Sequence, residues 1–387
     1  MMHLFINSLA ASAGGGLTYV RNVIPQMAMH PDLQVTAALS PALRKEFPSF
    51  PNVDLLELDM PATRRFWYEQ TKLPDLIRRT RADVLLSAGN FALRNTPVPQ
   101  ILLSRNSIYT SGDFYRDLRL RHEYKAWFDT HLRAGLAKRS IRWADVTIAP
   151  SEAFAAELTR WAGKPVRAIY HGFDREAFTR DLTPLDAELE QKLRVAEESI
   201  KLLFVSHYNY YRNFETLIRA LPPLRDRLGR PVKLLLTCKL VAGESPGAYN
   251  PERAANLIEK LGVSDMVIEL GAIPHEQLHQ LYRRANLYVT PAYTETFAHP
   301  LVESMASALP VVASDLPVHR EICGDAALYF ARFSCQELVD RVCELATVPE
   351  MATRLSASGV ERSTAFSWKR HVDTLLAVAR TLVGSRR

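Results

Sequence analysis

Residues 291–313 read Pro-Ala-Tyr-Thr-Glu-Thr-Phe-Ala-His-Pro-Leu-Val-Glu-Ser-Met-Ala-Ser-Ala-Leu-Pro-Val-Val-Ala. A short apolar run with strand character, Leu287–Thr290, precedes this stretch, and a second one opens at Val311–Ala313. The chain must therefore cross from one strand to the next, as in half of a βαβ unit. Because Pro300 stands where a first helical turn tolerates a residue without an N–H group, we predict a helix that begins near His299.

The start of this helix is a natural seat for an anion. Its backbone N–H groups are unpaired and carry partial positive charge, so the loop Thr296–His299 suits a phosphate. Glu295 lies before the helix, and Glu303 lies about one turn inside it, roughly 5–6 Å along the axis. Two carboxylates beside a phosphate can accept hydrogen bonds from the hydroxyl groups of a sugar. The alternative is an ordinary helix with acidic residues near its start.

The pattern Glu-x7-Glu, followed by small residues and Pro-Val-Val-Ala, resembles the signature of the retaining glycosyltransferases of family four, which are also called glycosyl transferases group 1 and have the two-domain GT-B fold. By this resemblance, Glu295 would contact the donor sugar and Glu303 the ribose of the nucleotide. The loop and helix start would hold the sugar hydroxyls or phosphate, through Phe297, Ala298, His299, Leu301 and Val302.

Two residues of this stretch differ from the family pattern. Ala298 stands where the family often has glycine, and Ala308 stands where it usually has glycine before Leu-Pro. Both are small, so we expect the close approach of a ligand to the backbone to be perturbed rather than blocked.

Length and composition limit the class of protein. The 387 residues, of which 47% are hydrophobic, favour two packed domains. An apolar run of eighteen residues is absent, and the chain goes directly into a strand without the layout of a secretory signal, which predicts a cytoplasmic protein.

The net charge of +6 fits an anionic substrate or an anionic membrane surface as well as nucleic acid. The four cysteines form no Cys-x-x-Cys pair, so we expect buried thiols rather than a zinc site or disulfides.

A glycine-rich stretch follows the first strand. The residues Ser12-Ala13-Gly14-Gly15-Gly16 stand between the strand His3–Asn7 and a helical pattern that begins at Leu17. Glycines there let backbone amides approach a phosphate, although the dinucleotide fingerprint Gly-x-Gly-x-x-Gly is absent. The resemblance implies that Gly15 and Gly16 face the donor phosphates and the acceptor. A simple tight turn is the alternative.

Strand and helix signals alternate through the first half of the chain. This alternation predicts a mostly parallel sheet with ligands beyond the carboxyl ends of its strands. The predicted strands after the first one are Leu33–Leu39, Val53–Leu58, Val84–Ala88, Gln100–Ser104, Val146–Ala149 and Val166–Tyr170. Where the family commonly has a histidine near the reacting carbon of the donor, this chain has Arg105-Asn106, and either Arg105 or Asn106 is a candidate to substitute for it. Ser151 follows a strand end too, and it reads more simply as a helix N-cap.

The segment Asp113–Trp143 mixes eight lysines and arginines with six aromatic residues. Such a helix can lie on anionic lipid or grip an acidic acceptor. Long basic side chains can also just cover the solvated face of a helix. Both interpretations stay open from the sequence.

The second half begins with a strand, Lys201–Val205, followed by Ser206-His207-Tyr208-Asn209-Tyr210-Tyr211-Arg212-Asn213. In the family this is Gly-Arg and then Lys-Asn, two cations that neutralise the donor diphosphate. By resemblance Ser206 and His207 take the first pair of positions, and Arg212 takes the position of the lysine, where it can bind phosphate bidentately.

More strand signals follow, at Val232–Cys238, Val267–Leu270, Leu287–Thr290, Val311–Ser314 and Ala327–Phe330. Lys239 comes directly after the first of these and either reaches the phosphates or ends the strand. The resemblance implies that the backbone around Ile273 meets the base.

The resemblance therefore implies an α/β, GT-B architecture with two Rossmann-like domains that face a central cleft. Residues 1–175 would form the acceptor-side domain and residues 176–367 the nucleotide-sugar domain, with the polar run Arg180–Ser199 as the connection. A terminal amphipathic helix, residues 368–387, would pack back on the first domain.

We predict a retaining hexosyltransferase of polysaccharide biosynthesis with a UDP- or GDP-linked donor and a glycan, lipid-linked or small-molecule acceptor. Nucleic acid is not expected as a partner, and peripheral contact with an anionic membrane is one of the two interpretations of the basic aromatic segment. An Asp-x-Asp triplet that could hold a metal against the diphosphate is absent, so we predict a reaction without metal or other cofactor. A sugar-nucleotide epimerase of the same fold and a non-catalytic sugar-nucleotide-binding protein are the alternatives.

Overall fold

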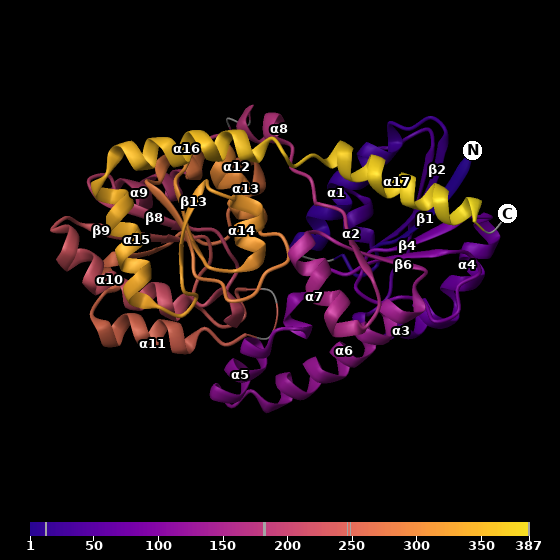
Figure 1. The fold of residues 1–387 in the computed structure, drawn as a ribbon, viewed down its shortest axis with the longest axis horizontal. Coiled ribbons are helices and arrows are strands. Elements are labelled where there is room, and N and C mark those ends of the chain that lie inside the picture. The colour runs from indigo at the N-terminus through magenta and orange to yellow at the C-terminus, as the bar shows by residue number, and fades with distance from the viewer. Residues whose placement is uncertain (12–13, 181–182, 246, 248, 386–387) are drawn as a thin grey trace. The chain divides into compact units, whose positions relative to one another are not determined.

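The structure is a computed structural model that describes residues 1–11, 14–180, 183–245, 247 and 249–385. Ser12 and Ala13 of the glycine-rich stretch lie outside the described residues, as do the last two residues of the predicted terminal helix, 386–387. Two compact units divide the chain (Figure 1). Unit 1 comprises Met1–Ser111, Leu118–Gly172 and Phe366–Arg387, and unit 2 comprises Gly112–Asp117 and Phe173–Ala365.

Unit 1 is built on a seven-stranded parallel sheet of order β3-β2-β1-β4-β5-β6-β7. Successive side chains of a strand point to opposite faces of the sheet, so Leu4 and Ile6 enter one core while Phe5 enters the other. Helices therefore cover both faces. The strands are β1 (Met2–Asn7), β2 (Leu33–Leu39), β3 (Val53–Glu57), β4 (Val84–Ser87), β5 (Gln100–Leu103), β6 (Val146–Ala149) and β7 (Val166–Ala168).

The helices of unit 1 include one from the far end of the sequence. Helix α17 packs on unit 1, where His371 hydrogen-bonds through Nδ1 to the Tyr170 carbonyl (2.8 Å) and through Nε2 to the Tyr19 hydroxyl (3.1 Å). The helices are α1 (Gly15–Ala28), α2 (Pro41–Arg44), α3 (Ala62–Thr71), α4 (Leu73–Thr80), η1 (Ser107–Tyr109), α6 (Tyr124–Trp143), α7 (Glu152–Ala162) and α17 (Trp368–Gly384). Helix α5 (Gly112–Leu120) starts in the short segment that groups with unit 2.

Unit 2 repeats this architecture with a six-stranded parallel sheet of order β10-β9-β8-β11-β12-β13. Its strands are almost continuously apolar, as expected for a parallel sheet that is covered on both faces. The strands are β8 (Ile200–Phe204), β9 (Val232–Leu236), β10 (Val267–Glu269), β11 (Leu287–Thr290), β12 (Val311–Ser314) and β13 (Ala327–Phe330).

The helices of unit 2 include one, α9, within the run Arg180–Ser199 that the sequence predicts to be a connection. Residues 183–199 pack on this unit, because Leu185, Leu189 and Leu193 bury their side chains in it. The helices are α8 (Arg175–Arg180), α9 (Ala187–Arg194), η2 (Tyr210–Arg212), α10 (Phe214–Leu228), α11 (Glu252–Leu261), η3 (Ser264–Met266), α12 (His275–Arg284), α13 (His299–Ala306), α14 (Pro317–Cys323), α15 (Cys335–Thr347) and α16 (Pro349–Ser363).

The predicted fold class, two α/β units with parallel Rossmann-like sheets, is confirmed. Each strand that the sequence predicts is present, with ends that differ by at most about two residues. Of the four thiols, Cys335 is only half-buried and the other three are buried. Within the described residues, every helix is too short or too polar to span a bilayer.

Candidate active site

The start of α13 is the centre of the site in unit 2. The helix begins at His299, as predicted, and its N-cap residue Ala298 has the left-handed backbone angles φ 64° and ψ 68°. None of the described side chains caps this start, and Pro300 brings no N–H group to it. The partly positive end of the helix is therefore open to an external acceptor of hydrogen bonds.

Arg212 and Glu295 form an ion pair beside this helix start. The Nη1 group of Arg212 donates to Glu295 Oε2, and the N–H group of Thr296 donates to Glu295 Oε1 at 2.9 Å. Burial raises the pKa of Glu295, but the charge of Arg212 and the bond from Thr296 outweigh it, so the pKa lies below its ordinary value. Burial lowers the pKa of Arg212, but the charge of Glu295 raises it by more, so the pKa lies above its ordinary value. Both groups are charged at neutral pH.

Asn213 fixes the position of Arg212. Its backbone is left-handed with φ 58°, which asparagine tolerates better than most residues. Its Nδ2 group donates to the carbonyl of Pro291 (3.0 Å) and to that of Arg332 (2.9 Å). The turn that carries Arg212 is thereby tied to the loop that leaves β11, which is the loop that carries Glu295.

Glu303 lies about one turn into α13, and it is buried. The hydroxyl of Tyr282, on α12, donates to Glu303 Oε2 at 2.8 Å. Burial raises the pKa of Glu303, while His275 and the bond from Tyr282 lower it by less. Its second oxygen can still accept from a hydroxyl group of a ligand.

The half-buried His299 and the buried His319 flank the ion pair. The ring of His299 packs on that of Phe297 with 4.9 Å between centroids, and His319 places Nδ1 2.9 Å from the Ser314 carbonyl. Burial lowers the pKa of both histidines to about 4, against a smaller raising effect of Glu295. Both imidazoles are thus neutral at pH 7, and Arg212 is the cation at this point.

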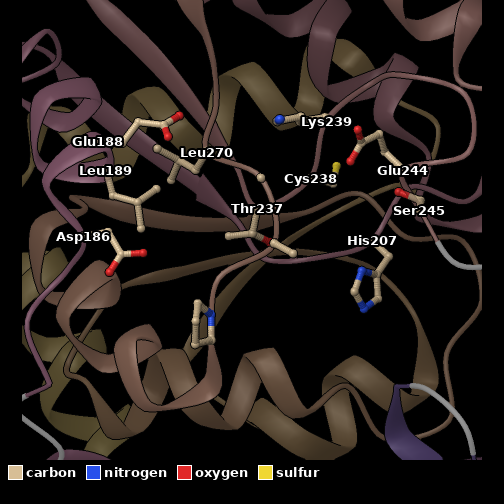
Figure 2. A pocket seen from close by; sticks show the side chains of 13 residues that line it. Asp186, Glu188, Leu189, His207, Thr237, Cys238, Lys239, Glu244, Ser245 and Leu270 are labelled. Carbon is tan, nitrogen blue, oxygen red and sulfur yellow. The ribbon is translucent and has the colours of Figure 1, made fainter.

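A cavity of about 280 Å³ opens in unit 2 next to His207. In Figure 2 the hydroxyl-bearing Thr237 lies between His207 and the acidic side chains of Asp186 and Glu188. Burial, and then the charge of Arg212, lower the pKa of His207. The cavity is lined by Asp186, Glu188, Leu189, His207, Thr237, Cys238, Lys239, Glu244, Ser245, Leu270, Gly271, Ala272 and Pro274.

Some of the predicted donor-site residues line or adjoin this cavity, and others do not. His207 and Lys239 line the cavity, Ser206 donates its backbone N–H group to Thr237 Oγ1 at 2.9 Å, and Ile273 stands between two lining residues. By contrast, the side chains of Phe297, Leu301 and Val302 are buried. These three residues can meet a ligand only through their backbone.

In unit 1, Arg105 lies at the start of α1. Its Nε group donates to the Ala88 carbonyl at 3.1 Å, and its backbone N–H group donates to Asn90 Oδ1 at 2.7 Å. A Cβ atom on Gly16 would collide with the guanidinium group, so a side chain there would displace the end of Arg105. Burial lowers the pKa of Arg105 to about 10, against a smaller raising effect of Tyr19.

Asn106, the other predicted substitute for the family histidine, has a local structural partner. Its Oδ1 atom caps η1 by accepting from the N–H group of Ile108 at 3.3 Å. Ser151 likewise caps α7 through its contact with the Phe154 N–H group (3.3 Å), which confirms the simpler interpretation of that serine.

Sequence reasoning missed two buried carboxylate contacts. Tyr282 stands far from Glu303 along the chain, and Glu69 accepts from Asn7 Nδ2 at 3.2 Å at the carboxyl end of β1. Burial raises the pKa of Glu69. Neither partner belongs to a motif, so the sequence carries no signal for either contact. Elsewhere too, within the described residues, His, Cys, Asp and Glu side chains do not gather in the groups of three that hold a metal ion.

Comparisons with protein families match both halves of the chain. Residues 186–362 match the model of Glycosyl transferases group 1, and residues 13–177 match that of Glycosyltransferase Family 4. A D-inositol 3-phosphate glycosyltransferase of Thermobifida fusca is 30% identical over 254 residues, which are 62% of this chain and 56% of the relative. Another from Actinosynnema mirum is 29% identical over 60% of this chain and 57% of the relative. The chain thus spans little more than half the length of these curated relatives.

Solved structures share the fold over the whole chain. A sucrose-phosphate synthase of Thermosynechococcus elongatus has a TM-score of 0.76 at 19% identity and covers 100% of both chains. HepE of Anabaena, in complex with UDP-glucose, has a TM-score of 0.75 at 17% identity and covers 99% of this chain and 100% of its own. At these identities the likeness concerns the fold alone.

Proposed function

Because the chain belongs to the glycosyltransferases described by the group 1 and family 4 models, we propose that it transfers a hexose from a UDP- or GDP-linked donor to a hydroxyl group, with retention at the anomeric carbon. The observation that carries this proposal is the ion pair of Arg212 and Glu295 at the uncapped start of α13. It puts a fixed cation and a fixed carboxylate where a phosphate and a sugar hydroxyl could bind side by side.

The donor diphosphate would lie against this helix start. Arg212 keeps donors besides the one that binds Glu295, and a guanidinium group binds phosphate oxygens in a bidentate manner. The backbone around Ala298 and His299 adds the positive end of the helix. Since Arg212 is already held by Glu295 and by the turn at Asn213, little reorganisation is needed when the phosphate binds.

The nucleoside would occupy the cavity beside His207. A volume of about 280 Å³ is large enough for a base with its ribose, near the lower end of ordinary ligand pockets. Lys239 and His207 would approach the phosphates, and the backbone around Ile273 would meet the base. Glu303, whose second oxygen is available to a ligand, would accept from a ribose hydroxyl group.

In the transfer step, the bond between the anomeric carbon and the diphosphate oxygen breaks, and a bond to the acceptor oxygen forms on the same face. The acceptor proton passes to an oxygen of the departing diphosphate. Arg212 and the start of α13 would stabilise the charge that develops there, while Glu295 would hold a hydroxyl group of the sugar. Since Arg212 carries the cationic role, we propose that the reaction needs no metal ion.

Unit 1 would bind the acceptor. Arg105 is a cation without a described carboxylate beside it, at the positive end of α1, so an acceptor with an anionic group such as a phosphate is favoured. The names of the relatives, which act on an inositol phosphate, support this choice. A glycan or lipid-linked acceptor, a role in polysaccharide biosynthesis and a cytoplasmic location stay predictions.

Incubation with UDP- and GDP-sugars tests the proposal. Release of nucleotide that depends on an added acceptor, such as D-inositol 3-phosphate, with EDTA present, would support metal-free transfer. A new epimer without release would point to an epimerase, and binding without turnover would point to a sugar-nucleotide-binding protein. Glu303→Ala provides a control, since it should weaken nucleotide binding while Glu295→Gln should abolish transfer and leave nucleotide binding measurable.

A further inference from the structure

Helix α6 of unit 1 exposes a row of large apolar side chains. Tyr124, Phe128 and Leu132 are 61%, 57% and 59% exposed, and Leu120, just before the helix, is 65% exposed. The spacing of four residues places the three helical members on one side of α6. With a rise of 1.5 Å per residue, the row from Tyr124 to Leu132 extends about 12 Å along the axis.

The opposite side of α6 has the reverse character. The residues that it buries are mostly small or polar, namely Thr130, Ala134, Ala137, Ser140 and Ile141. A surface helix normally buries its large apolar side chains and exposes small or polar ones. Because α6 does the opposite in its first half, its outer side has the properties of an interaction surface.

The charge around this row is strongly positive. Lys125, Arg133 and Arg139 are exposed on the same helix, and Arg119 is exposed shortly before it. From residue 116 to residue 142 the sequence has eight basic and three acidic residues, which are Arg116, Arg119, Arg121, Lys125, Arg133, Lys138, Arg139 and Arg142 against Asp117, Glu123 and Asp129. A second copy of the chain would bring the same positive surface face to face with this one, which disfavours a symmetric dimer. An anionic lipid surface complements it.

We propose that α6 docks on an anionic lipid bilayer. Tyr124, Phe128 and Leu132 enter the boundary between headgroups and acyl chains, with the tyrosine hydroxyl at the level of the headgroups. Lys125 and Arg133 contact the lipid phosphates. This docking surface is independent of the proposed chemistry, since it lies on side chains that the candidate active site does not use.

Sedimentation of the full chain with vesicles tests the docking. We expect binding to vesicles of an equal mixture of phosphatidylglycerol and phosphatidylcholine, and at least about ten times weaker binding to phosphatidylcholine alone. At about 1 M salt the Debye length is about 3 Å, so binding should be lost. Equal binding to both vesicles, or binding to neither, would overturn the proposal.

Matched variants distinguish vesicle binding through this surface from nonspecific adsorption of the protein. The double variant Phe128→Glu/Leu132→Glu should lose at least about tenfold in vesicle binding, with unchanged thermal unfolding because both side chains are exposed. Met29→Glu and Val195→Glu change side chains that are 72% and 68% exposed elsewhere, and they should bind as the parent does. If the double variant instead abolished a dimer seen by analytical ultracentrifugation and bound vesicles like the parent, the surface would belong to a second copy and the proposal would be wrong.

Discussion

The starts of α13 in unit 2 and α1 in unit 1 are built alike but charged differently. Each follows a strand, each has an N-cap residue with positive φ, Ala298 at 64° and Gly14 at 55°, and each has an arginine beside it. In unit 2 the carboxylate of Glu295 pairs with Arg212, whereas the guanidinium group of Arg105 in unit 1 donates to the backbone carbonyl of Ala88. Unit 2 thus balances the charge of Arg212 with its own carboxylate, whereas no described carboxylate acts on the charge of Arg105 in unit 1.

The largest expected effect comes from removing the carboxylate of unit 2. Glu295→Ala leaves Arg212 as a mostly buried, unbalanced cation, so the free energy of unfolding should fall by about 3–5 kcal/mol, and sugar transfer should cease. Chemical denaturation and an assay of nucleotide release measure the two effects. The double variant Glu295→Ala/Arg212→Met removes the stranded charge and should recover part of the stability, without activity. A loss below about 1 kcal/mol for the single variant would show that the pair is not coupled.

Acid should weaken unit 2 more than unit 1. His299 and His319 in unit 2 and His371 in unit 1 have a pKa of about 4, below the value of 6.5 for the unfolded chain. Between these values the unfolded chain binds more protons, so the stability present above pH 6.5 is lost as the pH falls toward 4, by about 2 kcal/mol per histidine at pH 5. Hydrogen exchange at pH 7 and pH 5 should therefore show a larger loss of protection in β11–α14 than in α1 and α17. Equal losses in both units would contradict this.

Removal of the cation of unit 1 should affect binding more than stability. Arg105→Met strands no partner carboxylate, so the free energy of unfolding should change by less than about 1 kcal/mol, in contrast with the variant at Glu295. Affinity for a phosphorylated acceptor should fall by roughly 10–100-fold, which corresponds to one charge-assisted hydrogen bond. Calorimetry with D-inositol 3-phosphate and with unphosphorylated inositol measures this, and only the phosphorylated compound should respond. A collapse of stability would mean that Arg105 has a structural role instead.

The smallest effects concern the two N-cap residues. Ala298→Gly removes the strain of an alanine in the left-handed conformation, so it should stabilise the protein by about 1 kcal/mol. Ala308 has a φ of 56° and lies outside the donor site, and Ala308→Gly should stabilise the protein by the same amount. Gly14→Ala should destabilise by at least about 1 kcal/mol, because its φ of 55° disfavours a side chain even though no described atom lies within 4 Å of the added Cβ. Thermal unfolding measures all three. A destabilised Ala298→Gly would show that alanine is needed there for another reason.

Much of the fold could be read from the sequence because its cause is local. Apolar runs such as Leu287–Thr290 fix the strands, and Pro300 marks the start of α13. The motifs that carry the family resemblance also predicted that Arg212 and Glu295 belong to one site. That Arg212 is already paired with Glu295 could not be predicted, since the pair depends on a long-range tie from Asn213 to two distant carbonyl groups.

Other features depend on contacts that carry no motif. The hydrogen bond from Tyr282 to Glu303 and the bond from Asn7 to Glu69 join residues whose spacing has no periodicity. The helix Ala187–Arg194 looked like a polar connection because its leucines are separated by charged residues, yet they bury against unit 2. The basic aromatic segment was visible in the sequence, but the outward orientation of Phe128 and Leu132 required the structure.

The position of the donor diphosphate decides whether Arg212 and the start of α13 bind it. A crystal structure of the chain with a UDP- or GDP-sugar should show the diphosphate at the first turn of α13, within hydrogen-bonding distance of Arg212, and the nucleoside in the cavity beside His207. A diphosphate bound at any other place, with Arg212 still engaged by Glu295 alone, would contradict the central claim.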